Sequence, residues 1–289
     1  MTKMRKVLWI TAGVLFLIPA VIFFFYDLEI SKAIVQDNPN FLFRILDAVG
    51  EFPIYIAPVL FGLVFGFCSE NKYLKTVFHM IGLIAIYICL VRLTGGIFEQ
   101  FYNSELSLLQ YILLPIASLL IYILLVILVA KINLQKLYNI KDLTLIGVIL
   151  SISSFIIVTA IKYIWGRPRF MYLDDQYLDY SNYLTIHGFS NSLLGNRNLS
   201  FPSGHTNSAS CIIVLLLIFK RLTNKKWVHM LIGIGCYGYI LLVALSRVCI
   251  GAHYASDVLF AFGINSLCLI TIYGIFKKKG WLHVRGNKC

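Results

Sequence analysis

The fold class is clearest in an uncharged stretch of sequence, LQYILLPIASLLIYILLVILVA, at residues 109–130. A helix needs about 20 apolar residues to cross the roughly 30 Å hydrocarbon core of a bilayer, so this stretch is long enough to be a membrane span. The chain of 289 residues is 59% hydrophobic and only 13% charged, against roughly 25% charged residues in a typical soluble domain. This composition excludes a disordered, fibrous or ordinary cytosolic protein and predicts an all-α bundle of transmembrane helices.

Further stretches share this apolar character, and together they predict about eight spans. The others are residues 7–26, 53–69, 76–95, 143–164, 205–219, 228–246 and 254–276. The first stretch follows basic residues, as the apolar part of a signal peptide would. Its apolar run is nevertheless as long as a full span, and no small-residue cleavage site follows it. We therefore expect an uncleaved span.

Basic residues are distributed unevenly between the segments that connect these stretches. The chain contains 25 Lys and Arg against 13 Asp and Glu, and 17 of the basic residues but only two of the acidic ones fall in alternate segments. These segments are residues 1–6, 70–75, 131–142, 220–227 and 277–289. Because cytoplasmic loops are enriched in Lys and Arg, both termini are predicted to lie in the cytoplasm. The positive charge then requires no nucleic-acid partner. The Lys- and Ile-rich composition indicates a bacterium with an AT-rich genome, so we expect an integral protein of a bacterial cell membrane.

Three features concern packing. Residues 166–204 form the longest non-apolar stretch and are expected to be either a solvated loop, with its tyrosines at the membrane interface, or a lid over a substrate head group. Gly62 and Gly66 form a GxxxG pattern, which favours close helix packing, with a dimer face as the alternative. The oligomeric state stays open. The cysteines show no metal-ligand spacing and are expected to be small, buried apolar residues: Cys68, Cys89, Cys211, Cys236, Cys249, Cys268 and Cys289.

The first cluster of polar residues lies at the end of the fifth stretch. Lys162 is in its last turn, and Gly166 and Pro168 end the helix before Arg169. Lys162 and Arg169, seven positions apart across a helix end, can converge on one anion. The alternative is that both side chains extend toward the membrane interface, as basic residues near helix ends commonly do.

The second cluster, Phe201-Pro-Ser-Gly-His205, directly precedes the sixth stretch. Proline is favourable at a helix start, and Ser203 and Gly204 place backbone N–H groups at the positive end of the helix, where anions bind. His205 could then donate a proton to a leaving oxygen. The alternative is an ordinary helix cap followed by an incidental histidine.

The third cluster, Ser246-Arg247 followed by His253 and Asp257, opens the eighth stretch. His253 and Asp257 are four residues apart and share one face of a helix. The carboxylate could hold one imidazole nitrogen as a donor and leave the other as a nucleophile. A charged residue inside an apolar stretch is a functional candidate. The alternative is a structural hydrogen bond between two helices.

Together the clusters supply three cations, a helix N-terminus, an acid and an oriented imidazole at the same ends of the helices. That set suits the transfer of a phosphoryl group, which the protein must position and whose negative charge it must stabilise. The sequence shows neither an acidic cluster suited to Mg²⁺ nor Cys and His spacing suited to Zn²⁺. We therefore expect a reaction without metal ion or cofactor.

The three clusters, in this order, resemble the type 2 phosphatidic acid phosphatase superfamily, which also contains vanadium-dependent haloperoxidases and glucose-6-phosphatase. The resemblance covers roughly residues 110–276. The chain departs from the family pattern at Phe170, where the family usually has proline. A register that uses Arg167 and Pro168 instead places the arginine too close to Lys162.

The resemblance implies a role for each matched residue. His253 would form a phosphohistidine, Asp257 would orient it, and His205 would protonate the leaving group. The phosphate-binding residues would be Lys162, Arg169, Ser203, Gly204 and Arg247, with Arg167 as a nearby helper.

The resemblance also implies an architecture and an activity. A phosphatase core of six spans at residues 110–276 would follow additional helices at 1–109 and precede a basic cytoplasmic tail at 277–289. The expected function is hydrolysis of a lipid mono- or diphosphate, such as phosphatidate or undecaprenyl diphosphate, on the outer side of the membrane. Phosphotransfer to a lipid or sugar is the enzymatic alternative. Transport is disfavoured because the charges lie at helix ends and not near the bilayer midplane.

Overall fold

The computed structural model describes residues 3–102 and 104–282. Within these residues, seven helices are long and apolar enough to cross a membrane, and a bent helix pair provides an eighth candidate span. The helices are α1 (Lys3–Ile34), the bent pair α2 (Phe41–Val49) and α3 (Pro53–Cys68), α4 (Lys72–Tyr102), α5 (Leu108–Ala130), α6 (Leu134–Tyr138), α7 (Lys141–Trp165), α8 (Phe189–Ser192), α9 (Gly204–Ser210), α10 (Ile213–Leu222), α11 (Lys226–Cys249) and α12 (Ala255–Lys278). The predicted all-α bundle of about eight spans is confirmed.

The second span differs from its prediction because a short helix, α2, precedes it. Asn40 caps α2 by accepting a hydrogen bond from the backbone N–H of Phe43 at 3.0 Å. Pro53 then starts α3, whose axis is bent by 41° from that of α2. Residues 41–49 lie outside the eight predicted stretches because Arg44 and Asp47 interrupt their apolar run.

The sixth span is also divided, into α9 and α10. α9 has the polar sequence GHTNSAS, yet most of its side chains are buried. Asn265 of α12 compensates for this polarity by donating hydrogen bonds to the backbone and side-chain oxygens of Asn207, both at 3.2 Å. Polar side chains inside a helical bundle are satisfied in this way by neighbouring helices.

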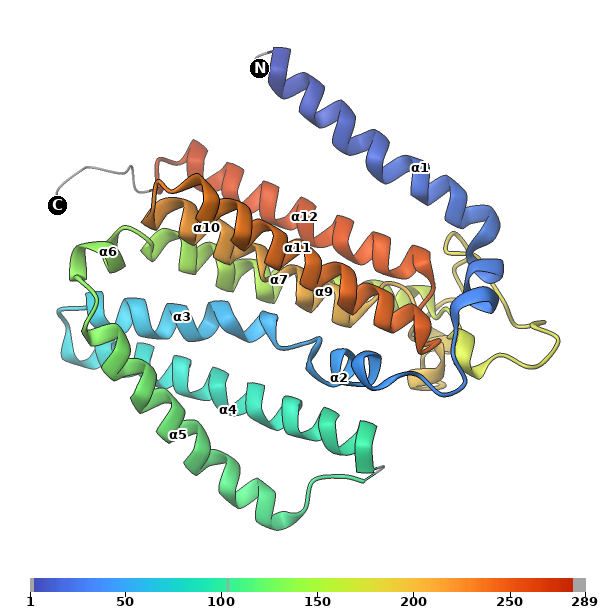
Figure 1. Ribbon diagram of the computed structural model, residues 1–289, viewed down its shortest axis with the longest axis horizontal. Coiled ribbons are helices and arrows are strands. Elements are labelled where there is room, and N and C mark those ends of the chain that lie inside the picture. The colour runs from blue at the N-terminus through green and yellow to red at the C-terminus, as the bar shows by residue number, and fades with distance from the viewer. Residues whose placement is uncertain (1–2, 103, 283–289) are drawn as a thin grey trace.

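Helix α7 occupies the centre of the bundle. Its residues Leu143, Ile146 and Leu150 are buried and pack against Val64 of α3 and Val214 of α10. Helices α9, α10, α11 and α12 lie along the other side of α7 (Figure 1). Between helices in a membrane, such interlocking side chains stabilise the bundle through van der Waals contact. α7 can therefore hold the residues at its end in a defined place.

Helices α4 and α5 form a hairpin on the outside of α3. Leu63 of α3, Ile86 of α4 and Tyr122 of α5 pack together in a small cluster. Figure 1 shows α3 between this hairpin and the bundle around α7. α1, by contrast, packs on α12 and α11. The predicted boundary between additional helices and core, at residues 109 and 110, falls in the first turn of α5 and stays a prediction.

The GxxxG pattern of α3 brings α3 and α4 close together. A Cβ atom on Gly62 would lie 2.6 Å from the Cα atom of Gly82, and one on Gly66 would lie 2.6 Å from the ring of His79. Both neighbours belong to α4 of the same chain. The glycines therefore permit close packing within the chain, and the alternative of a dimer face loses its support.

We expect Gly62→Val to destabilise the protein, because the new side chain would push the backbones of α3 and α4 apart. Overpacking of this kind costs about 1–3 kcal/mol. The matched control is Gly235→Val in α11, where a Cβ atom meets no other atom within 4 Å. Thermal unfolding of both variants in detergent measures the difference. Equal midpoints for the two variants would contradict the expectation.

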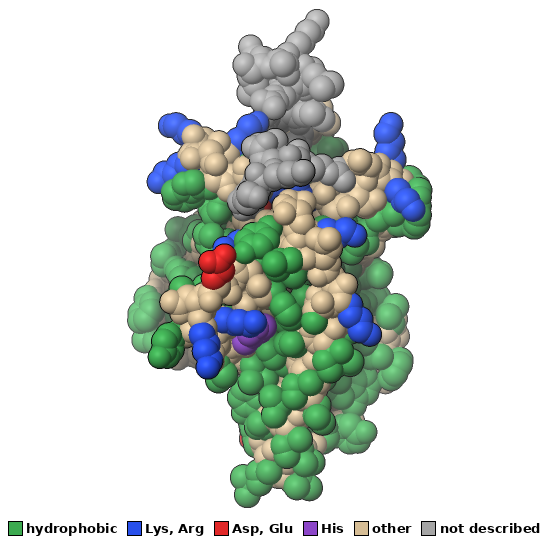
Figure 2. Space-filling view, turned by 90° about the vertical axis from the view of Figure 1, so that its left-hand side faces the viewer, with side chains coloured by type: hydrophobic (Ala, Val, Ile, Leu, Met, Phe, Trp, Pro, Cys, Tyr) green, Lys and Arg blue, Asp and Glu red, His purple; other side chains and the backbone are tan. Residues whose placement is uncertain are grey.

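The two ends of the bundle differ in charge. The connections α3–α4, α5–α7 and α10–α11 lie at one end, with the end of α12 (Figure 1). Figure 2 shows that Lys and Arg side chains are spread over this face, which we call the basic end. The opposite end carries α2, residues 166–203 and the turn between α11 and α12.

Residues 166–203 are folded against the helices. The indole N–H of Trp165 donates to the carbonyl of Tyr183 at 2.7 Å, and the hydroxyl of Tyr183 donates to the carbonyl of Ala20 in α1 at 2.9 Å. The segment contains α8 and two single-turn 3₁₀ helices, Phe170–Tyr172 and Asn196–Asn198. It thus connects α7 to α1.

The cysteines in the described part of the chain are free thiols, five of them buried and Cys268 partly buried, as expected. Cys289 and residues 283–288 of the predicted cytoplasmic tail lie outside the described residues.

Candidate active site

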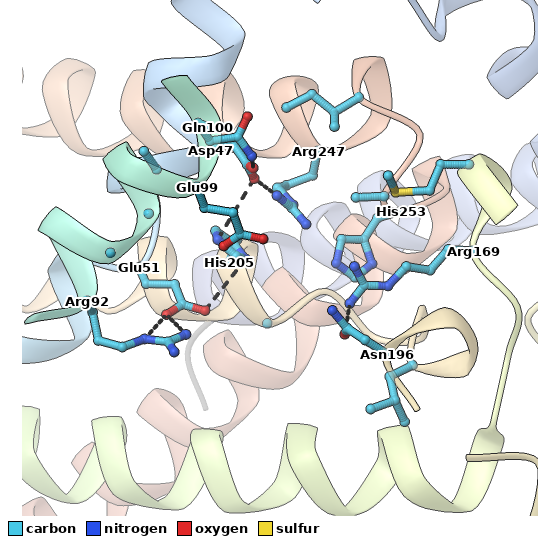
Figure 3. A pocket seen from close by; sticks show the side chains of 18 of the residues that line it. Asp47, Glu51, Arg92, Glu99, Gln100, Arg169, Asn196, His205, Arg247 and His253 are labelled. Atoms are coloured by element: carbon cyan, nitrogen blue, oxygen red, sulfur yellow. Dashed lines mark hydrogen bonds and ion pairs between the residues drawn. The ribbon is translucent and has the colours of Figure 1, made fainter. Parts of the chain in front are cut away.

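A cavity of about 980 Å³ opens at the end of the bundle opposite the basic end. Six of the nine predicted site residues line it, and all three sequence clusters contribute. These six are Lys162, Arg169, Gly204, His205, Arg247 and His253 (Figure 3). Segments that are far apart along the chain therefore meet in one space large enough for a phosphorylated head group.

The end of α7 positions Lys162 and Arg169. Gly166 ends the helix with a left-handed φ of +58°, and its N–H donates to the carbonyl of Lys162 at 3.0 Å. The ammonium of Lys162 donates to the carbonyl of Leu199 at 2.7 Å. The guanidinium of Arg169 donates from Nη2 to Asn196 at 2.7 Å, while its buried Nε has no partner. That unused N–H is available to an anion in the cavity.

Phe170, which departs from the family's usual proline, has a packing role. Its ring stacks on Tyr177, with centroids 5.6 Å apart, and meets Tyr254 edge to face at 6.3 Å. Tyr254 directly follows His253. The aromatic side chain therefore ties the turn after Arg169 to the turn that carries the histidine.

His253 lies in the turn between α11 and α12 and is only 1% exposed. Its Nδ1 lies 2.7 Å from the backbone carbonyl of Ser200 and 3.5 Å from the Oδ2 atom of Asp257. Because a carbonyl oxygen can only accept, Nδ1 carries the proton and Nε2 keeps a free lone pair. Burial holds the pKa of His253 well below its ordinary value near 6.5, so the ring is neutral at pH 7.

Asp257 supports His253 mainly indirectly, by holding Ser200 and the backbone of Tyr254. Its Oδ2 accepts from the hydroxyl of Ser200 at 2.5 Å and from the N–H of Tyr254 at 2.9 Å. The predicted direct contact with His253 is present as the longer, 3.5 Å pair, and the closer partner is the Ser200 carbonyl. Sequence reasoning missed Ser200 because any residue type offers a backbone carbonyl.

Arg167, the predicted helper for phosphate binding, does not line the cavity. It is fully buried between two carboxylates, with Nη1 at 2.6 Å from Oδ1 of Asp257 and Nη2 at 3.0 Å from Oδ2 of Asp27 in α1. Its guanidinium also lies 3.9 Å from the ring centroid of Tyr254. Arg167 therefore holds Asp257 on the side away from the cavity and joins α1 to the first turn of α12.

Ser203, a predicted phosphate ligand, also does not line the cavity. It is the N-cap of α9: its hydroxyl oxygen accepts from the N–H of Thr206 at 3.3 Å and from the Thr206 hydroxyl at 3.1 Å. Its own N–H donates to the carbonyl of Asp257 at 3.1 Å. Gly204, the next residue, does line the cavity.

One stretch of the chain, which contains Lys162, Arg169, Arg247 and His253, matches a known family. Residues 142–281 match the model of the PAP2 superfamily. These residues belong to the PAP2 superfamily. The resemblance to type 2 phosphatidic acid phosphatases is confirmed, and the matched stretch, which begins at the start of α7, includes Lys162, Arg169, Arg247 and both site histidines.

The PAP2 part of the chain is similar to two curated bacterial proteins named phosphatidylglycerophosphatase B. The protein from Bacillus subtilis is 32% identical over 92 residues, which cover 30% of this chain and 43% of the relative. The protein from Haemophilus influenzae is 34% identical over 95 residues, which cover 32% of this chain and 38% of the relative. The chain thus spans less than half the length of these relatives. No solved structure matches the chain.

The helices that precede the PAP2 residues form another wall of the cavity, which sequence reasoning missed. Four carboxylates line this wall: Asp47, Glu51, Glu99 and Glu105. Asp47 of α2 pairs with Arg247 and accepts a hydrogen bond from Gln100 of α4. Figure 3 shows Asp47, Glu51 and Glu99 on one side of the cavity and Arg169 with His253 on the other. One signal was available in the sequence: Asp47 and Glu51 are charged residues four apart, directly before an apolar span.

The described residues contain no group of three or more His, Cys, Asp or Glu side chains that could hold a metal ion. The expectation of a reaction without metal ion or cofactor stays a prediction.

Proposed function

We propose that this chain is a membrane-bound lipid phosphate phosphatase that works through a phosphohistidine. The observation that carries the proposal is the convergence of Lys162, Arg169 and Arg247 with His253 and His205 on one cavity. Three cations around a neutral imidazole can bind a phosphate and stabilise the charge that develops as it is transferred. The PAP2 membership of residues 142–281 supports the same reading.

In the proposed reaction, Nε2 of His253 attacks the phosphorus atom. A P–N bond forms while the bond from phosphorus to the lipid oxygen breaks. His205 gives its proton to that leaving oxygen. His205 then takes a proton from a water molecule, which attacks the phosphohistidine, releases inorganic phosphate and restores His253.

The substrate we favour is a phospholipid that carries a phosphomonoester. The names of the two relatives support a phospholipid such as phosphatidylglycerol phosphate or phosphatidate. A polyprenyl diphosphate would bring a second phosphate group toward a cavity wall that carries Glu99 and Glu105 in addition to the pairs Asp47–Arg247 and Glu51–Arg92, and like charges at close range repel one another. This repulsion makes undecaprenyl diphosphate the weaker candidate.

The cavity is proposed to face the outer side of a bacterial cell membrane. The basis is the collection of Lys and Arg at the opposite end of the bundle (Figure 2), because cytoplasmic segments carry such an excess. Lipid substrates would then reach His253 from the outer leaflet.

The test is phosphate release by the purified full-length chain in detergent with EDTA. Phosphatidylglycerol phosphate, phosphatidate and undecaprenyl diphosphate are compared, and we expect the two monoesters to be hydrolysed faster. Radiolabelled phosphatidate, quenched in alkali, should leave a label on His253 that acid removes, as a phosphohistidine would. Mass spectrometry of the products separates hydrolysis from transfer to a lipid or sugar acceptor. No phosphate release from any of the three lipids would overturn the proposal.

A further inference from the structure

We infer that Glu51, held by Arg92, is the positioning residue for His205, the proposed proton donor. The inference rests on the proposed function. It gives the bent helix pair α2–α3 and the outer helix α4 a part in the reaction, although both lie outside the PAP2 residues.

The ring of His205 lies against the corner between α2 and α3. Nδ1 of His205 is 3.6 Å from Oε1 of Glu51, and Nε2 is 3.9 Å from Oδ1 of Asp47. At the same corner, a Cβ atom on Gly50 would lie 3.2 Å from the imidazole carbon Cδ2. Carboxylates therefore face both ring nitrogens, and the backbone of the corner closes one side of the ring.

The two oxygen atoms of Glu51 have different partners. Oε2 accepts from Nη2 of Arg92 at 2.7 Å and from Nε at 3.2 Å. Oε1 is left facing His205 (Figure 3). A guanidinium that binds one oxygen through two N–H groups fixes the orientation of the whole carboxylate. Arg92, from α4, thus orients the Glu51 carboxylate so that Oε1 faces His205.

This arrangement suits a proton donor. A carboxylate at Nδ1 holds the ring in one orientation, so that Nε2, the nitrogen on the side of Asp47 and Arg247, is the one that can give a proton to a leaving group. The same logic applies wherever a carboxylate orients a catalytic histidine. The chain supplies one such support for each histidine: the Ser200 carbonyl with Asp257 for His253, and Glu51 with Arg92 for His205.

The competing explanation is a structural ion pair, since the Arg92 side chain is 59% exposed. The two explanations differ in their dependence on the leaving group. The alkoxide that leaves phosphatidate needs a proton, whereas p-nitrophenolate leaves readily without one. In the step that releases the leaving group, loss of a proton donor therefore slows the first substrate selectively, while a structural defect slows both.

The experiment compares the kcat/KM of Glu51→Gln with that of the wild-type chain on phosphatidate and on p-nitrophenyl phosphate, because kcat/KM excludes the later hydrolysis of the phosphohistidine that both substrates share. General acid catalysis contributes about 10²–10⁴-fold, and we expect loss of the positioning group to remove part of it. The kcat/KM for phosphatidate should fall about 10- to 100-fold, and the kcat/KM for p-nitrophenyl phosphate less than about threefold. His205→Ala should show the same selectivity, and adding Glu51→Gln to it should cause no further loss.

Two further variants control the result. Glu105→Gln removes the same charge from the cavity wall at a residue that is not a neighbour of His205. It should change the rate constants for both substrates by one common factor. Arg92→Met removes the hydrogen bonds that hold Glu51 and should cause a smaller loss of activity that is again selective for phosphatidate. This variant also tests the inference if Glu51→Gln does not fold. The inference would be overturned if folded Glu51→Gln and Arg92→Met lost activity equally on both substrates, or lost none. Such a result would leave wild-type hydrolysis, and so the proposed function, intact.

Discussion

Replacing His253 with asparagine is expected to lower the rate of phosphate release by about 10⁴-fold or more, the usual effect of removing a catalytic nucleophile. Asparagine can still donate a hydrogen bond from the position of Nδ1 to the carbonyl of Ser200, which is 2.7 Å away in the native protein. It has no counterpart of Nε2. The variant should therefore fold and bind lipid but form no phosphorylated intermediate.

The measurement is single-turnover phosphate release with radiolabelled phosphatidate, together with the unfolding midpoint in detergent. His187→Asn is the matched control, because His187 bonds to the hydroxyl of Ser181 at 2.8 Å and does not line the cavity. The control should keep the wild-type rate within a few fold. A folded His253→Asn protein that retains more than about 1% of the rate would mean that another group attacks the phosphate.

The second large effect is on stability. Arg167→Met should destabilise the protein by about 3–5 kcal/mol, because it removes the cation from between two buried carboxylates. Asp27 and Asp257 are both fully buried and would be left next to each other without a counter-charge. Methionine fills a similar volume, so the loss of charge dominates the result. Equilibrium unfolding in mixed micelles, followed by circular dichroism, measures the change.

An exposed arginine provides the comparison. Arg197 pairs with Asp179 at 3.7 Å, and both side chains are more than half exposed. Arg197→Met should cost less than about 1 kcal/mol. Adding Asp27→Asn to Arg167→Met should recover part of the lost stability, since one unpaired charge is removed. If Arg167→Met and Arg197→Met unfold alike, the buried pairs do not stabilise the fold.

The membrane spans and six of the residues that line the cavity could be predicted from the sequence. Apolar stretches of about 20 residues are a local signal that depends little on tertiary packing. Lys162, Arg169 and His253 lie in short clusters whose spacing carries their chemistry. α2 could not be recognised in this way, because Arg44 and Asp47 interrupt its apolar run and its burial comes from α4 and α11.

The supporting residues could not be predicted because their roles arise from contacts between distant segments. Glu51 meets His205 across more than 150 residues of chain, and no spacing rule connects them. Ser200 acts partly through its backbone. Arg167 and Ser203 carry the residue types of phosphate ligands, but their hydrogen-bonding capacity is taken up by Asp27, Asp257 and Thr206. Residue type alone therefore does not separate a ligand from a residue that supports it.

The buried pairs of Arg167 also impose an order on biogenesis. Asp27 enters the membrane with α1, 140 residues before Arg167 is synthesised and 229 residues before Ser256, which donates to it as well. A lone carboxylate is costly in hydrocarbon. Asp27 therefore obtains its counter-charge only when Arg167 has been made, and its contact with Ser256 only when α12 has been made. A chain whose synthesis stops before α12 would leave Asp27 without Ser256 and Arg167 without Asp257, so membrane quality control could recognise it by these uncompensated charges.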